Sequence, residues 1–304
     1  MKSQTIAAID IGSNSVKLTV VETGRDSLNF ILQERERVRV DAVLREKFLS
    51  AEAVEISVAA VEKFRAIAEN LKAETIIAVA TASAREARNA SDFIVEIERQ
   101  TGIRAEILPA IEEARLIGLA ARYYFRSRKG KLLNIDIGGG STELSLMKTN
   151  QPEKLFSMNL GAVGLTGRFL SENPPTEKEL ENLREEIRRN LEKPIEELRG
   201  ENWQITTGTS GTILKFAALL NSENGAVYLK SLVELNRRLT KMTVAERVAL
   251  PNISEKRAEL LIAGGQILEG AMRALKIEKL EPCQYALREG VIIDFLRNNQ
   301  KIDF

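Results

Sequence analysis

Apolar positions follow two different periods along the first part of the chain. Residues 5–11 and 75–80 are short apolar runs rich in β-branched side chains, which is typical of buried strands. Between them, apolar residues recur every three or four positions from Val54 to Leu71, which predicts an amphipathic helix. Strands that alternate with helices in this way predict an α/β fold.

The same reasoning predicts the other elements of the first part. Further strands are expected at residues 16–22, 28–33, 35–40 and 104–108, and further helices at residues 83–100 and 111–125. A turn-forming set, Gly12-Ser13-Asn14-Ser15, separates the first two strands.

A basic polar connector at residues 126–131 divides the chain, and the pattern restarts after it. Pro194 lies inside one of the expected helices and predicts a kink or a break there. We expect a first domain at residues 1–125 and a second at residues 126–304, with the last helix, about 291–304, able to pack back on the first. In the second domain, strands are expected at residues 132–137, 142–147 and 204–207, and helices at residues 176–199, 227–241, 244–250, 254–275 and 286–298. Residues 208–212 are expected to open one more helix.

The two parts share a motif. Residues 10–20 align without gaps on residues 136–146, with identical residues at five of eleven positions. The offset is one domain length, so the alignment predicts duplication of a strand–turn–strand unit. The alternative is two unrelated glycine-rich hairpins.

Composition excludes several kinds of site. The chain has no histidine and one cysteine, Cys283, which excludes catalytic triads that use histidine, cysteine-based zinc sites and a disulfide framework. Acid–base chemistry must therefore use Asp, Glu, Lys or Tyr, and a bound metal is expected to be a hard cation with oxygen ligands. The net charge is +1, which argues against a nucleic-acid wrapper. No signal peptide and no membrane span are apparent, so a cytoplasmic protein is expected.

Three glycine- and hydroxyl-rich loops are candidate phosphate cradles, because such turns expose several backbone N–H groups together. Two are the turns of the repeated motif, and the third opens a helix, where a plain Ser/Thr helix cap is an equal alternative. The residues concerned are Ser13, Asn14 and Ser15; Gly138, Gly139, Gly140, Ser141 and Thr142; and Ser210, Gly211 and Thr212.

Charged residues accompany these loops at matched positions. Asp10 and Asp136 each end a strand before the turn, where a lone Asp is usually a turn former but a matched pair beside phosphate cradles suits Mg²⁺. Glu143 follows Asp136 on the returning strand, and its counterpart in the first motif, Lys17, is a candidate phosphate partner. The cations from Arg122 to Lys131 either guide a polyanion or belong to a solvated linker.

An ordered set of motifs resembles the exopolyphosphatase / guanosine pentaphosphatase family, in a short two-domain form, within the actin–Hsp70–sugar-kinase superfamily. The resemblance spans residues 5 to about 297. The motifs are Asp10-Ile11-Gly12-Ser13-Asn14-Ser15, Ala80-Thr81-Ala82-Ser83-Ala84-Arg85, Glu112-Glu113-Ala114-Arg115-Leu116, Asp136-Ile137-Gly138-Gly139-Gly140-Ser141-Thr142-Glu143, Thr209-Ser210-Gly211-Thr212 and Leu287-Arg288-Glu289-Gly290.

The resemblance implies two ribonuclease-H-like lobes with an interdomain cleft. It implies that Glu113 is the general base, that Asp136 is associated with magnesium and that Glu143 is also catalytic. Arg85 is expected to meet phosphate, although an exposed helix charge beside Glu86 is the alternative. Arg257 is a further candidate substrate contact. The family pattern commonly has Ser-Gly shortly before the paired glutamates, whereas this chain has Pro109-Ala110-Ile111.

The expected function is Mg²⁺-dependent hydrolysis of the terminal phosphoanhydride bond of inorganic polyphosphate. The alternatives are a guanosine pentaphosphate 5′-phosphohydrolase, a sugar or acetate kinase, and a non-catalytic sensor of guanosine tetraphosphate or polyphosphate. The kinase is disfavoured by the Glu-Glu-Ala-Arg-Leu and Thr-Ser-Gly-Thr motifs, and the sensor by Glu113, Asp136 and Glu143. No nucleic-acid or membrane partner is expected, and a homodimer is compatible with the resemblance.

Overall fold

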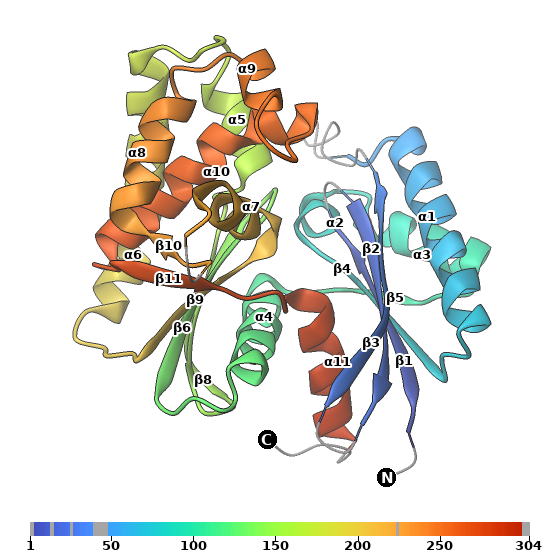
Figure 1. The fold of residues 1–304 in the computed structure, drawn as a ribbon. Coiled ribbons are helices and arrows are strands. Elements are labelled where there is room, and N and C mark those ends of the chain that lie inside the picture. The colour runs from blue at the N-terminus through green and yellow to red at the C-terminus, as the bar shows by residue number, and fades with distance from the viewer. Residues whose placement is uncertain (1–2, 13–14, 25–26, 39–47, 223–224, 300–304) are drawn as a thin grey trace. The chain divides into compact units, whose positions relative to one another are not determined.

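The protein forms two compact units in a computed structural model that describes residues 3–12, 15–24, 27–38, 48–222 and 225–299 (Figure 1). Unit 1 comprises Met1–Tyr123 and Tyr285–Phe304, and unit 2 comprises Tyr124–Gln284. The segment that returns to unit 1 therefore starts at Tyr285, inside the range 126–304 that the sequence assigned to the second domain. No helix in these described ranges is long and apolar enough to cross a membrane.

Unit 1 contains a five-stranded sheet in the order β3-β2-β1-β4-β5. The strands β1, β2 and β3 pair antiparallel, whereas β4 pairs parallel to β1 and β5 parallel to β4. The two strands expected at residues 28–33 and 35–40 form a single strand, β3, as far as residue 37. The strand bounds are β1 (Thr5–Ile11), β2 (Ser15–Thr23), β3 (Leu28–Arg37), β4 (Thr75–Ala80) and β5 (Ala105–Ile107).

Helices cover both faces of this sheet. Apolar residues of α1 (Ala51–Asn70) and α3 (Ala90–Thr101) form one core cluster with side chains of β1 and β2. Apolar residues of α4 (Ala110–Tyr124) and α11 (Leu287–Asn298) form a second cluster on the other face. Each strand thus contributes alternate residues to two cores.

The single helix expected at residues 83–100 is wrong. The structure has α2 (Ala82–Glu86) and α3, separated by a break in which Ala87 is extended. The Asn89 side chain accepts from Leu49 N and donates to Leu49 O, both at 2.9 Å. These two hydrogen bonds to a distant loop favour the break, because Asn readily leaves a helix to bond other backbone groups.

Unit 2 contains a six-stranded sheet in the order β10-β11-β9-β6-β7-β8. The sequence analysis missed β8, β10 and β11. β8 reads Gln-Pro-Glu-Lys-Leu-Phe-Ser-Met, which is polar because it is a partly exposed edge strand, and β10 is only two residues long. The strand bounds are β6 (Lys131–Ile137), β7 (Thr142–Lys148), β8 (Gln151–Met158), β9 (Ile205–Thr209), β10 (Val227–Tyr228) and β11 (Lys279–Pro282).

The helices of unit 2 pack with this sheet in one large core cluster. The sequence analysis also missed the short helix α5, and it placed Val227 and Tyr228 in a helix that begins only at Leu229. The helix bounds are α5 (Ala162–Phe169), α6 (Glu177–Leu198), α7 (Ser210–Leu220), α8 (Leu229–Leu239), α9 (Val244–Val248) and α10 (Glu255–Ala274).

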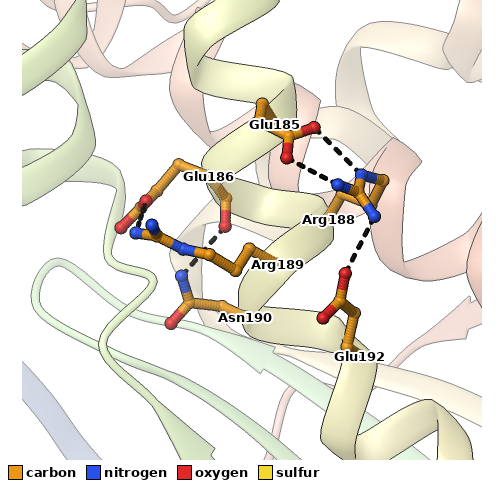
Figure 2. Close-up of polar contacts among 6 residues, drawn as sticks. All are labelled: Glu185, Glu186, Arg188, Arg189, Asn190 and Glu192. Carbon is orange, nitrogen blue, oxygen red and sulfur yellow. Dashed lines mark hydrogen bonds and ion pairs between the residues drawn. The ribbon is translucent and has the colours of Figure 1, made fainter.

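The charged helix α6 continues through Pro194, so the break considered from the sequence does not occur. An interior proline costs a helix ~3 kcal/mol. Pro194 lies on the buried stripe with Leu191 and Leu198, and each buried leucine contributes about 1.5–3 kcal/mol, so packing outweighs the cost. Figure 2 shows the exposed face, where Arg188 bonds Glu185 and Glu192.

The two sheets have the same topology. Strands β1, β2, β3, β4 and β5 correspond to β6, β7, β8, β9 and β11, with the same order and the same parallel and antiparallel pairs. The registers also agree, because Asp10 lies opposite Lys17 and Asp136 lies opposite Glu143. The expected α/β fold of two similarly built, ribonuclease-H-like lobes is confirmed.

Candidate functional site

Several of the predicted residues lie at the carboxyl-terminal ends of parallel strands in the unit 1 sheet. The parallel strands β1, β4 and β5 all end on this side of the sheet, and the loops that follow them lie there together. Thr81 N donates to Ile11 O at 3.2 Å, and Leu108 N donates to Ala80 O at 2.9 Å. The first turn closes through Gly12 N, which donates to Ser15 O at 3.1 Å. The turn, α2 and α4 therefore begin side by side.

Asp10 and Lys17 form an ion pair beside this turn. Lys17 Nζ lies 2.9 Å from Asp10 Oδ2, and Asp10 is buried at 5% exposure. The pair follows from the antiparallel register, which places the two residues directly opposite each other. Asp10, predicted as a metal residue, has a base as its nearest charged partner here, and its role toward a metal stays a prediction.

Glu113 and Arg85 also lie together in unit 1. Glu113 is in the first turn of α4 and is buried at 8% exposure. Arg85 Nη1 donates to Glu113 Oε2 at 3.0 Å and to Leu108 O at 2.8 Å. The guanidinium thus fixes the orientation of the carboxylate. The structure brings together the predicted base and the predicted phosphate-binding arginine, and Pro109 O accepts from Glu113 N at 3.0 Å despite the altered loop sequence.

The adjacent glutamate has a different environment. Glu112 accepts from Arg115, which also donates to Asp294 of α11 at 2.8 Å. Hydrogen bonding to Glu112 is the first cause that raises the pKa of Arg115 above its ordinary value. Glu112 therefore joins α4 to α11. Of the two adjacent glutamates, Glu113 is the one that contacts Arg85 at the carboxyl-terminal ends of the parallel strands.

In unit 2, backbone hydrogen bonds fix the turn that contains Gly138, Gly139 and Gly140. Gly138 N donates to Ser141 O at 2.8 Å, while Ala162 N and Val163 N of α5 donate to the carbonyl oxygens of Gly138 and Gly139. A trans peptide plane points its N–H away from its C=O. The N–H groups of Gly139 and Gly140 therefore point away from α5, as in an anion-binding nest.

Gly161 permits this arrangement. A Cβ at Gly161 would lie 2.0 Å from Gly139 O and 2.3 Å from Gly140 C. Only glycine fits here, because backbone atoms cannot move aside as a side chain can. The sequence analysis missed Gly161, since nothing local in the sequence marks its contact with a distant turn.

Two carboxylates face each other on the adjacent strands of unit 2. Asp136 and Glu143 are directly opposed and are buried at 7% and 1% exposure. Directly opposite residues have Cβ atoms about 5 Å apart. Thr209 donates its hydroxyl to Asp136 Oδ2 and accepts from Asn134 Nδ2, while Ser157 Oγ donates to Glu143 Oε1 at 2.7 Å. Hydroxyl groups thus orient both carboxylates.

This carboxylate pair fits a magnesium ion. Mg²⁺ is usually held by one or two carboxylates together with waters and substrate phosphates, rather than by an all-protein cage. Across the described ranges, no group of three or more Asp, Glu or Cys side chains is placed to hold a metal. Two oriented carboxylates beside a phosphate nest are consistent with that mode of binding.

The third loop lies at the start of α7. Ser210 has φ +88°, a left-handed conformation that is strained for serine, and its Oγ accepts from Thr212 N at 3.2 Å. A Cβ at Gly211 would lie 3.0 Å from Arg257 Nη2. The predicted residues Ser210, Gly211, Thr212 and Arg257 are therefore neighbours within unit 2.

Other predicted residues have different placements. Thr142 is fully buried and its hydroxyl donates to Leu160 O, so that hydroxyl is used inside the fold. Ser15 and Ser141 are buried at 2% and 5% exposure and close their turns through backbone carbonyls. Ser13 and Asn14 lie outside the described residues.

The basic connector is largely engaged with acids. Arg122 is buried, Arg128 Nη1 lies 2.9 Å from Glu281, and Lys131 pairs with Glu153 and Glu201. Arg128 and Lys131 are thus paired with acids, whereas Arg126 and Lys129 are exposed. A role of these cations toward a polyanion stays a prediction.

The residues that orient the carboxylates, Thr209, Ser157 and Asn134, were not among the predicted site residues. Thr209 lies in a recognised motif, but Ser157 is on the missed strand β8.

Comparison with known proteins identifies the family. The model of the Ppx/GppA phosphatase family matches residues 19–299. Exopolyphosphatase 1 of Mycobacterium leprae is 31% identical over 299 residues, which cover 95% of this chain and 88% of that protein. A Ppx/GppA family member of Aquifex aeolicus has a similar structure, with a TM-score of 0.85, 26% identity and coverage of 98% of this chain and 99% of that one. The expected resemblance is confirmed, and the chain belongs to the Ppx/GppA phosphatase family.

Proposed function

We propose that the protein is an exopolyphosphatase, which hydrolyses the terminal phosphoanhydride bond of inorganic polyphosphate and releases orthophosphate. Membership of the Ppx/GppA family and relatives described as exopolyphosphatases support this function. The observation that carries it is the matched pair of hairpin turns, each anchored by a buried aspartate. One hairpin carries a lysine opposite its aspartate, and the other carries a second carboxylate.

Glu113 is proposed to act as the general base. Its carboxylate accepts a proton from a water molecule while the water oxygen forms a bond to the terminal phosphorus. The bridging P–O bond breaks, and the bridging oxygen leaves with the electron pair on the shortened polyphosphate. Arg85 orients the carboxylate through the 3.0 Å hydrogen bond and presents a positive charge beside it.

The second unit is proposed to bind a metal and phosphate. Asp136 and Glu143 would hold magnesium, which when bound offsets negative charge on the phosphate oxygens. The N–H groups of Gly139 and Gly140 would donate to phosphate oxygens, as would the loop at Gly211 with Arg257. A cytoplasmic location and a homodimer stay predictions of the sequence.

The test is phosphate release from long polyphosphate, tripolyphosphate and guanosine pentaphosphate, each measured with magnesium and with a chelator. We expect release from the two polyphosphates that needs magnesium, with E113Q as the matched inactive control. Absence of release from both polyphosphates would contradict the proposal. Release from guanosine pentaphosphate alone would instead indicate the alternative 5′-phosphohydrolase.

A further inference from the structure

Charge is segregated between the two faces of the edge strand β3. Side chains alternate between the faces of a strand. Gln33 Nε2 donates to Glu289 Oε1 of α11 at 3.2 Å, while Glu36 pairs with Lys63 of α1. From Gln33 to Arg37, odd-numbered residues therefore face α11 and even-numbered residues face α1. In the run Gln-Glu-Arg-Glu-Arg, both arginines, Arg35 and Arg37, lie on the α11 face.

This face continues the row of residues that contains Asp10. Asp10 lies opposite Lys17, and Lys17 lies opposite Arg35 on the next strand. Neighbouring strands are about 4.8 Å apart, so the three residues form a line from the middle of the sheet to its edge. Arg37 lies opposite Ser15, beside the first phosphate-cradle turn. The arginines thus extend from the candidate phosphate site along the edge strand.

A third arginine reaches the same place from α11. Arg288 Nη1 donates to Leu18 O at 2.9 Å, next to Lys17. Partial burial lowers the pKa of Arg35, and the positive charges of Arg37 and Arg288 lower it further, whereas Asp10 raises it. These directions reflect three guanidinium groups close enough to repel one another.

Few acids compensate this positive charge. Asp10 pairs with Lys17, and buried Glu289 accepts from Thr19, Gln33 and Ala286 N. Within the described ranges, Arg35, Arg37 and Arg288 make no ion pair, in contrast to the arginines of α1 and α3 on the opposite face. An arginine cluster of this kind suits phosphate, because guanidinium groups bind phosphate oxygens in a fork and stay charged at any ordinary pH.

We propose that Arg35, Arg37 and Arg288 form a second anion subsite, which binds phosphate groups of the same condensed-phosphate molecule that lie beyond the phosphate being hydrolysed. This inference rests on the proposed function and assigns residues to the polymer that it implies. Binding phosphate would relieve the repulsion between Arg35 and the other two guanidinium groups.

The test compares R35Q/R37Q with the control R65Q/R99Q, which removes the same charge from α1 and α3. Arg35 is partly desolvated, but both arginines keep accessible surface and lie outside the apolar core clusters, so the variant is expected to fold as the wild type does. Exposed charge contacts are individually weak, so two lost contacts with phosphate predict a KM for long polyphosphate raised roughly ten-fold with kcat unchanged. The control is expected to keep the wild-type KM.

A binding measurement separates this inference from the proposed function. Long polyphosphate is titrated against E113Q and against E113Q/R35Q/R37Q, so no turnover is needed. Weaker binding to the triple variant, with a smaller salt dependence, supports the subsite even if the wild type hydrolyses no polyphosphate. Equal affinities of E113Q and E113Q/R35Q/R37Q, or an equal loss of affinity in the control E113Q/R65Q/R99Q, would overturn it.

Discussion

The same row of the sheet carries opposite chemistry in the two units. In unit 1 the row reads Asp10, Lys17, Arg35, which is one acid followed by two bases. In unit 2 the matched row reads Asp136, Glu143, Ser157, which is two acids followed by a hydroxyl. The backbone register is shared, so the difference lies in the side chains alone. The shared scaffold thus carries more bases than acids in the row of unit 1 and two carboxylates without a base in the row of unit 2.

The surroundings of the two aspartates reinforce this contrast. Asp10 lies opposite Val79 of β4, whereas Asp136 lies opposite Thr209 of β9, which donates a hydrogen bond to it. Asp10 receives a lysine ammonium instead. We infer that the Asp10 carboxylate mainly positions Lys17, and that a role toward a metal belongs to Asp136, which has no lysine opposite it in the sheet. The predictions below test this division, from the largest effect to the smallest.

The largest effect is expected for E113Q in unit 1. The substitution keeps the shape of the side chain but removes the base, so kcat should fall by about 10²–10⁴-fold while KM changes little. Steady-state kinetics on tripolyphosphate measure it. Turnover near the wild-type rate would contradict the assignment of Glu113.

R85K should lower kcat less than E113Q does. Lysine keeps the positive charge but lacks the planar guanidinium, whose Nη1 donates to both Glu113 and Leu108 O.

A smaller effect is expected for T209V in unit 2. Valine keeps the shape of threonine but removes the hydroxyl that bonds Asp136 and accepts from Asn134. Residues that orient metal ligands typically contribute 10–100-fold in metal affinity or activity. The magnesium concentration for half-maximal activity should rise by about 10-fold. V79T at the matched position of unit 1 is the control, and an equal shift in both variants would refute a specific role for Thr209.

The smallest effect concerns stability alone. Glu179 accepts from Thr176 N at the start of α6, and this backbone hydrogen bond is the first cause that lowers its pKa to about 2. A carboxylate whose pKa is lower in the folded state than in the unfolded state stabilises the fold at pH values above its unfolded pKa. This stabilisation is lost as the pH falls toward 2. E179Q should therefore unfold more easily at pH 7, by at most about 1 kcal/mol, and the difference should shrink below pH 4.5.

Thermal unfolding at several pH values measures this effect. The kinetic constants of E179Q should equal those of the wild type, because α6 carries none of the proposed site residues. A changed magnesium requirement in E179Q would mean that destabilisation of the fold alone alters the magnesium requirement. A shift in that requirement would then no longer identify a metal-binding row.

Local patterns predicted much of this molecule, and long-range registers explain what they missed. The repeated Asp-Ile-Gly motif predicted two equivalent hairpins because strand, turn and strand are contiguous in sequence. Ser157 could not be found in the same way, since its meeting with Glu143 depends on the polar edge strand β8. The break at residues 87–89 was missed because Asn89 bonds a loop forty residues away.

The most direct test of the central claim is a magnesium titration of two variants, D136N in the row of unit 2 and K17Q in the row of unit 1. These residues occupy the same row of the two sheets. D136N should raise the magnesium concentration for half-maximal activity by about 10–100-fold. K17Q should raise KM for polyphosphate and leave that magnesium concentration unchanged. If K17Q shifts the magnesium requirement and D136N does not, the proposed division between the two units is contradicted.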